Sequence, residues 1–181
     1  MNSSTNFSPS GPEMPPRLRA RPILECLKRH EVRFVLIGGL ASIHWGSPFP
    51  TEDIDITPQR SRENLDRLSA ALTDLGARIR TLSEPEGLPF SHTGVSLADA
   101  AVWNLRTDYG DFDISFVPNG TEGFSDLDRD AESATVHGVE IRIASLADII
   151  RSKQAANRPK DQRVLPTLRE ILASRNPRNR Q

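Results

Sequence analysis

Hydrophobic residues recur along the first half of the chain with a period that changes between that of a helix and that of a strand. Residues 17–30 place apolar side chains three or four positions apart, whereas residues 33–37 form an unbroken apolar run typical of a buried strand. The predicted elements of this half are a helix (17–30), a strand (33–37), a short helix (40–45), a strand with strict alternation (53–56) and a long helix capped by Ser61 (61–75).

The second half of the chain predicts more strands than helices. A Tyr109-Gly110 turn joins two strand patterns into a hairpin, and Gly138 marks a turn within a later strand. Ser145 is expected to cap a helix, and Pro166 lies inside the last helical pattern, which it should kink or divide. The predicted elements are four strands (78–82, 100–106, 112–117 and 136–143) followed by two helices (145–156 and 159–173).

This order of elements predicts an α+β fold, in which helices flank a central mixed β-sheet and two further helices follow at the C-terminal end. A length of 181 residues suits one domain with a sizeable core. The Ser, Asn, Pro and Gly of the first residues offer too little apolar surface to fold. We therefore divide the chain into a disordered leader (1–16), a core (17–144), a C-terminal helical part of the same domain (145–175) and a tail (176–181).

Composition indicates the cellular compartment in which the protein is expected to act. No apolar stretch approaches the roughly 20 residues that span a bilayer, and residues 1–16 lack the pattern of a secretory signal. The single cysteine, Cys26, excludes an intramolecular disulfide and lies among apolar helix residues, where a packing role is expected. The four histidines show no metal-ligand spacing among themselves. These features predict a cytoplasmic protein with no membrane partner.

Charge is balanced over the whole chain but unbalanced towards its end. The formal net charge is −1, yet residues 151–181 carry nine Lys and Arg against only Asp161 and Glu170. Such a basic end fits either a nucleic-acid contact surface or a solvated helix face followed by a tail.

Two strand patterns carry carboxylates at alternate positions. A strand would turn Asp53 and Asp55 to the same side, and Asp113 occurs in a second alternating pattern. Neighbouring carboxylates repel, so a protein that keeps them normally supplies a cation, and oxygen ligands select Mg²⁺ or Mn²⁺. Pairing of the two strands would bring three carboxylates together, as in two-metal sites for phosphoryl displacement. Asp111 lies two residues before Asp113 and would face the same side of the strand. It is nearer the turn, however, and we interpret it as a solvated residue.

The glycine pair Gly38-Gly39 ends a strand pattern and begins a helical one. Glycines at such a junction let a ligand approach the backbone, and free amides at a helix start favour phosphate. This pair, a helix and then Asp-x-Asp resemble the signature of polymerase-beta-type nucleotidyltransferases. The chain resembles AbiEii-like and MenT-type nucleotidyltransferase toxins more closely. Four motifs carry this resemblance: Gly38-Gly39, Thr51-Glu-Asp53-Ile-Asp55, Asp113, and Lys153 followed by Arg158-Pro-Lys-Asp161.

The resemblance implies a nucleotidyltransferase-type sheet and a set of site residues. The implied metal ligands are Asp53, Asp55 and Asp113, the implied catalytic residues are these three with Lys153 and Asp161, and the implied nucleotide contacts are Gly38, Gly39, Thr51, Lys153 and Arg158. A compact ammonium such as that of Lys153 can pair with phosphate oxygens. Asp161 is expected either to orient Lys153 or Arg158 or to cap the helix after Pro159.

The resemblance also implies an activity and partners. It implies transfer of a nucleotide from a nucleoside triphosphate to an RNA acceptor such as the 3′ end of tRNA, which would block translation. The protein would then be the toxin of a toxin–antitoxin pair and would bind a cognate antitoxin. Two alternatives stay open: transfer to a hydroxyl of a small molecule or protein, as in antibiotic adenylyltransferases, and a catalytically inactive binding module of the same fold.

Overall fold

The computed structural model describes residues 18–175, so both the predicted leader and the predicted tail lie outside the described residues. One seven-stranded mixed sheet runs in the order β3-β4-β5-β2-β1-β7-β6. The strands are β1 (Phe34–Ile37), β2 (Asp53–Pro58), β3 (Arg78–Ile79), β4 (Val102–Thr107), β5 (Gly110–Ser115), β6 (Glu132–Val136) and β7 (Val139–Ile143). The helices are α1 (Ala20–Arg29), α2 (Gly38–His44), α3 (Arg62–Asp74), α4 (Gly94–Leu97), α5 (Phe124–Arg129), α6 (Leu146–Ala156) and α7 (Pro159–Arg175).

Strand β2 lies at the centre of the sheet and shows why the fold can carry charge beside its core. It pairs antiparallel with β1 and parallel with β5. Its apolar residues Ile54 and Ile56 are fully buried, whereas Asp53 and Asp55 alternate with them and face the other side of the sheet. The same strand therefore supplies both the core and a polar face.

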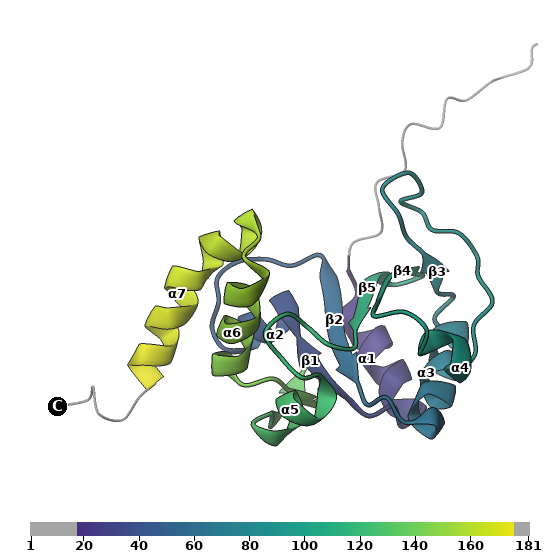
Figure 1. The fold of residues 1–181 in the computed structure, drawn as a ribbon, viewed down its shortest axis with the longest axis horizontal. Coiled ribbons are helices and arrows are strands. Elements are labelled where there is room, and N and C mark those ends of the chain that lie inside the picture. Colours follow the sequence, from purple (N-terminus) through teal and green to yellow (C-terminus); the bar gives the residue numbers. More distant parts are fainter. Residues whose placement is uncertain (1–17, 176–181) are drawn as a thin grey trace, which may run out of the picture.

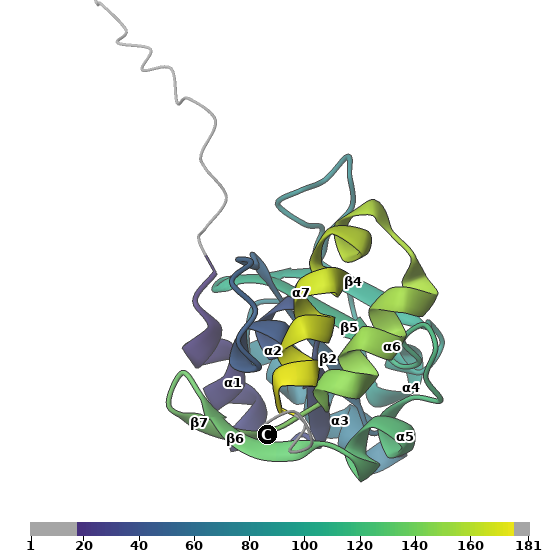
Figure 2. The same cartoon turned by 90° about the vertical axis from the view of Figure 1, so that its left-hand side faces the viewer.

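Two pairs of helices lie at opposite ends of the sheet. Figure 1 shows α6 and α7 together at one end and α3 with α4 at the other, and Figure 2 shows α6 and α7 side by side in front of the strands. Ser61 caps α3 and Ser145 caps α6 by accepting a hydrogen bond from the backbone amide three residues on, as expected. Among the described residues, no helix has both the length and the apolar character needed to cross a membrane.

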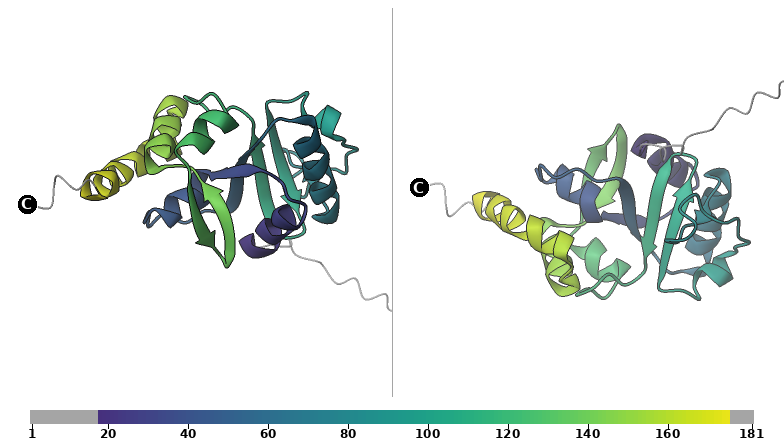
Figure 3. Two further views of the ribbon diagram at one scale, coloured as in Figure 1. Left: turned by 90° about the horizontal axis from the view of Figure 1, so that it is seen from below. Right: turned by 90° about the horizontal axis from the view of Figure 1, so that it is seen from above.

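The expected mixed sheet with flanking and C-terminal helices is confirmed, but several element predictions were wrong in detail. The strand expected at 136–143 is a hairpin of β6 and β7 that turns at Gly138. This hairpin lies beside α1 (Figure 3). The strand expected at 78–82 is only two residues long, and the short helices α4 and α5 were not predicted. Helix α7 runs without division through Pro166.

Candidate functional site

The register of the sheet lines up polar residues in a row across four strands. Arg80, directly after β3, donates its backbone amide to Asn104 of β4, and Asn104 lies opposite Asp113 of β5. Asp113 in turn lies opposite Asp55 of β2. Because directly opposed residues share a face of the sheet, the four side chains project to the same side.

Three carboxylates converge in and beside this row. One oxygen each of Asp53, Asp55 and Asp113 can be chosen so that all three lie within 4.8 Å of one another. Asp53 lies two residues before Asp55 on β2, and its carboxylate accepts a hydrogen bond of 2.6 Å from the Thr51 hydroxyl. The structure therefore brings together the three acidic residues that the alternation of two strand patterns had singled out.

The convergence is electrostatically costly. Burial, and then the charges of Asp53 and Asp113, raise the pKa of Asp55 to about 7. Burial also raises the pKa of Asp113, although the neighbouring guanidinium of Arg80 opposes the effect. A site that holds ionised carboxylates in this way favours a bound cation, because a cation relieves both the repulsion and the loss of hydration.

The glycine pair is explained by close packing against the acidic strand. Gly38 has a φ of +69°, and a Cβ there would collide with the carboxylate of Asp55. A Cβ at Gly39 would collide with the side chain of Thr51, and the Gly39 amide hydrogen-bonds to the carboxylate of Asp55. The pair thus lets the start of α2 lie directly against the carboxylate cluster.

The basic residues predicted near the site are held by one buried carboxylate. Asp161, at the start of α7, is completely buried, and it lies 3.3 Å from the Lys153 ammonium and 2.6 Å from the Arg158 guanidinium. Burial alone would raise the pKa of Asp161, but the hydrogen bond from Arg158 and the charge of Lys153 outweigh it and lower the pKa. Asp161 therefore orients both cations, which was one of the two roles left open.

A cavity of about 640 Å³ lies between these two groups. Its walls include the carboxylate cluster, Lys153, Arg158 and Lys160 from the C-terminal helices, and Phe49 from the loop before β2. Arg158 and Lys160 are close enough to the cluster to interact with the charge of Asp55. The predicted site residues that line this one cavity are Gly38, Gly39, Thr51, Asp53, Asp55, Asp113, Lys153, Arg158 and Asp161.

Arg80 is a site residue that the sequence did not reveal. Its guanidinium lies 3.1 Å from Asp113 and 3.4 Å from Asp111. Asp111 is not the solvated residue that its position near the turn suggested, because Arg106 also lies 3.0 Å from it and little of its side chain is exposed. These ion pairs depend on the order of three strands, and no local pattern of residues indicates them.

Comparison with known proteins supports the fold. No family model matches the chain, and no curated protein matches its sequence. Among solved structures, the lincomycin-bound lincosamide antibiotic adenylyltransferase LnuA is 17% identical, with a TM-score of 0.57 over 86% of this chain and 99% of that one. The antibiotic-resistance factor ANT(2″)-Ia is 16% identical, with a TM-score of 0.50 over 86% and 89%. A structure from Thermotoga maritima, named as a candidate nucleotidyltransferase, is 22% identical, with a TM-score of 0.48 over 86% and 91%. LnuA and ANT(2″)-Ia thus share the fold of this chain, which is of the nucleotidyltransferase type.

Proposed function

We propose that this protein is a metal-dependent nucleotidyltransferase that transfers a nucleotide from a nucleoside triphosphate to an acceptor hydroxyl. One observation carries the proposal: the carboxylates of Asp53, Asp55 and Asp113 converge in a cavity that Lys153 and Arg158 also line. The nucleotidyltransferase fold of the chain agrees with this assignment. Carboxylates and cations that line one cavity suit a metal–triphosphate complex, because the metal meets the carboxylates and the phosphates meet the cations.

The carboxylate cluster fits a hard divalent cation. Its donors are all oxygens, which Mg²⁺ and Mn²⁺ prefer, and the pKa of Asp55 is raised by burial and then by repulsion, both of which such a cation would offset. Asp53, Asp55 and Asp113 would hold the metal. When bound, the metal would lower the pKa of the acceptor hydroxyl and neutralise charge that develops on the triphosphate.

The remaining residues would bind and orient the triphosphate. Lys153 and Arg158, fixed by Asp161, would pair with phosphate oxygens, and the amides at the start of α2 lie beside the same cavity. In the reaction the acceptor oxygen bonds to the α-phosphorus, the bond from that phosphorus to the bridging oxygen breaks, and pyrophosphate leaves as the hydroxyl proton is released.

The direct test is incubation with each labelled nucleoside triphosphate, Mg²⁺ and candidate acceptors, with Asp55→Asn as the comparison. We expect label to enter an acceptor with the wild type and transfer to fall by about 10³-fold or more in Asp55→Asn, since metal coordination contributes several kcal/mol to such reactions. The exposed Asp99→Asn serves as the matched control. Absence of transfer with every triphosphate and acceptor, or an unchanged rate in Asp55→Asn, would favour an inactive binding module instead.

We favour an RNA acceptor, such as the 3′ end of tRNA. The exposed face of α7 carries Arg163 and Arg169, which make no ion pair within residues 18–175. Such a basic face would attract a polyanion. Modification of tRNA would block translation, so the protein would act in the cytoplasm as a toxin and would require a cognate antitoxin.

A second candidate acceptor is a small hydroxyl compound. It is favoured by the match to LnuA, which is named as an antibiotic adenylyltransferase, and by a cavity of the size that encloses small ligands. Charge reversal at Arg163 and Arg169 separates the two candidates, because both residues lie on the exposed face of α7. Loss of transfer in Arg163→Glu/Arg169→Glu supports RNA, whereas unchanged transfer to a small acceptor supports the second candidate.

A further inference from the structure

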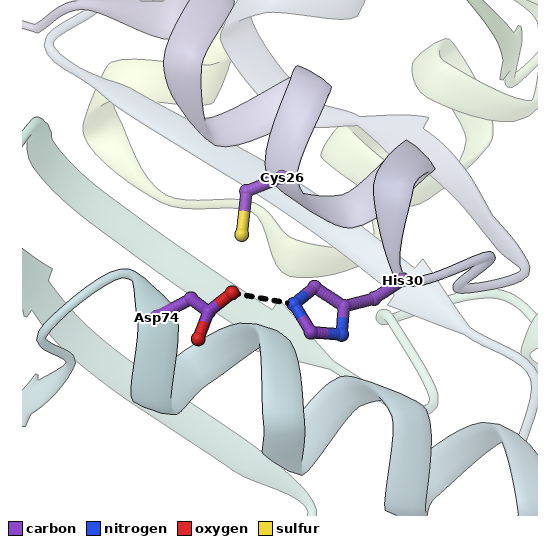
Figure 4. A group of neighbouring side chains, drawn as sticks. All are labelled: Cys26, His30 and Asp74. Atoms are coloured by element: carbon purple, nitrogen blue, oxygen red, sulfur yellow. Dashed lines mark hydrogen bonds and ion pairs between the residues drawn. The ribbon is translucent and has the colours of Figure 1, made fainter.

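A second cluster of metal-binding side chains lies between α1 and α3. Figure 4 shows Cys26 of α1 and His30, directly after α1, projecting towards Asp74 of α3. One ligand atom of each residue can be chosen so that all three lie within 4.8 Å of one another, and the His30 Nε2 atom lies 2.7 Å from an oxygen of Asp74. Cys26 and His30 are four positions apart, so the helical repeat places them on one face.

The surroundings of this cluster favour positive charge. His30 is the C-cap of α1, and Asp74 is the last residue of α3, so the negative ends of two helix dipoles meet here. The guanidinium of Arg29 lies 3.4 Å from the Cys26 sulfur and 3.2 Å from Asp74. A cationic group thus already lies against the two ligands, and its side chain is 63% exposed and can turn into solvent.

We propose that Cys26, His30 and Asp74 form a second metal site, specific for a zinc-like ion rather than for magnesium. The donor set decides the class of metal: sulfur and imidazole nitrogen suit zinc, whereas the cluster of Asp53, Asp55 and Asp113 offers only carboxylate oxygens. Three protein ligands would leave a fourth position for water. The bound ion would join α1 to α3 and displace Arg29 from the cluster.

The chemistry of Cys26 is compatible with this site. Its thiol is buried, and burial raises its pKa, so the free thiol is protonated and unreactive at neutral pH. Coordination by a zinc-like ion deprotonates a thiol outright, and the proton is released to solvent. The displaced Arg29 does not contact the proposed active site, so the second site can be tested apart from catalysis.

Cobalt(II) is a suitable probe because it reports the nature of its ligands. The background is the full chain with Asp53→Asn and Asp55→Asn, which removes binding at the carboxylate cluster. We expect one Co²⁺ per chain and a thiolate-to-cobalt charge-transfer band in the near ultraviolet, which Zn²⁺ abolishes by displacement. Cys26→Ser should remove the band and weaken binding by about 100-fold or more, since even outer-shell changes cost metal sites 10–100-fold.

Further variants distinguish a metal site from a network of ion pairs. His30→Gln should also weaken Co²⁺ binding, whereas His137→Gln, at an exposed histidine between β6 and β7, should not. Arg29→Gln should tighten binding several-fold, because it removes the competing cation, and circular dichroism checks that each variant is folded. Absence of the charge-transfer band in the background protein, or equal Co²⁺ affinity in folded Cys26→Ser, would overturn the proposal.

Discussion

The carboxyl of Asp55 couples stability to pH in the metal-free protein. Its pKa is about 7 in the folded state against an ordinary value of 3.8, so the folded state binds more protons than the unfolded state between these values. Stability therefore falls as the pH rises through this window. Asp55→Asn removes the free-energy cost of ionising this buried carboxyl without changing the shape of the side chain.

We predict that metal-free Asp55→Asn is more stable than the wild type at pH 8, by on the order of a few kcal/mol. The measurement is urea denaturation at pH 5 and pH 8 in the presence of a chelator. The gain should be smaller at pH 5, where the wild-type carboxyl is largely protonated. Equal stability of the two proteins at pH 8 would contradict the buried, repelled state of this carboxyl.

Arg80 competes with a metal for Asp113. Its guanidinium lies 3.1 Å from that carboxylate, and both side chains are partly shielded from water. Arg80→Gln should therefore tighten Mg²⁺ binding by about three- to tenfold, which corresponds to the loss of an ion pair worth roughly 1 kcal/mol. Isothermal titration with Mg²⁺ measures the effect.

Arg78→Gln is the matched control for this prediction. Arg78 belongs to β3, two residues before Arg80, but it pairs with Asp108 outside the carboxylate cluster. Its loss should leave Mg²⁺ affinity unchanged. A similar change in both variants would mean that general charge, and not the contact with Asp113, sets the affinity.

At the scale of elements, the sequence predicted those whose burial follows a regular period. Strand β2 and helix α3 were both recognisable, because one face of each is buried along its length. Strand β6 was missed because it is the edge of the sheet, and only Val136 of its five residues is buried. Helix α5 is six residues long, and its acidic Asp126 is held by Arg151 of α6, a contact that no local pattern contains.

The junction of α6 and α7 depends on the buried charge of Asp161. We predict that Asp161→Asn lowers the free energy of unfolding by about 2–4 kcal/mol, because it leaves Lys153 and Arg158 without their common partner. Since the pKa of Asp161 is lowered, its contribution is present at neutral pH and is lost as the pH falls into the acidic range. Thermal melting at pH 7 and pH 3 measures both effects.

Glu170→Gln provides the control on the same helix. Glu170 is exposed on α7 and should change stability by no more than about 0.5 kcal/mol. If Asp161→Asn behaved like this surface variant, the buried pair would not hold the two helices.

At the scale of the whole molecule, the order of strands determines which contacts of the site could be predicted from the sequence. Asp53 and Asp55 share a strand, so their proximity follows from the sequence, and Asp113 needed only one correct strand pairing. Arg80 reaches Asp113 across the intervening strand β4, which requires the order of β3, β4 and β5. Contacts within an element can therefore be predicted here, whereas contacts across several strands require the fold.

Charge at the molecular scale decides how the proposed RNA acceptor would bind. The net charge of −1 would not attract RNA, so binding must depend on the local basic face of α7. If about three phosphates contact this face, transfer to RNA at subsaturating concentration should fall about 20–40-fold between 50 and 200 mM salt. Arg163→Glu/Arg169→Glu should reduce both the rate and this dependence, because fewer counterions would be released. A salt dependence equal in variant and wild type would place RNA elsewhere on the molecule, and a flat one would favour a small acceptor.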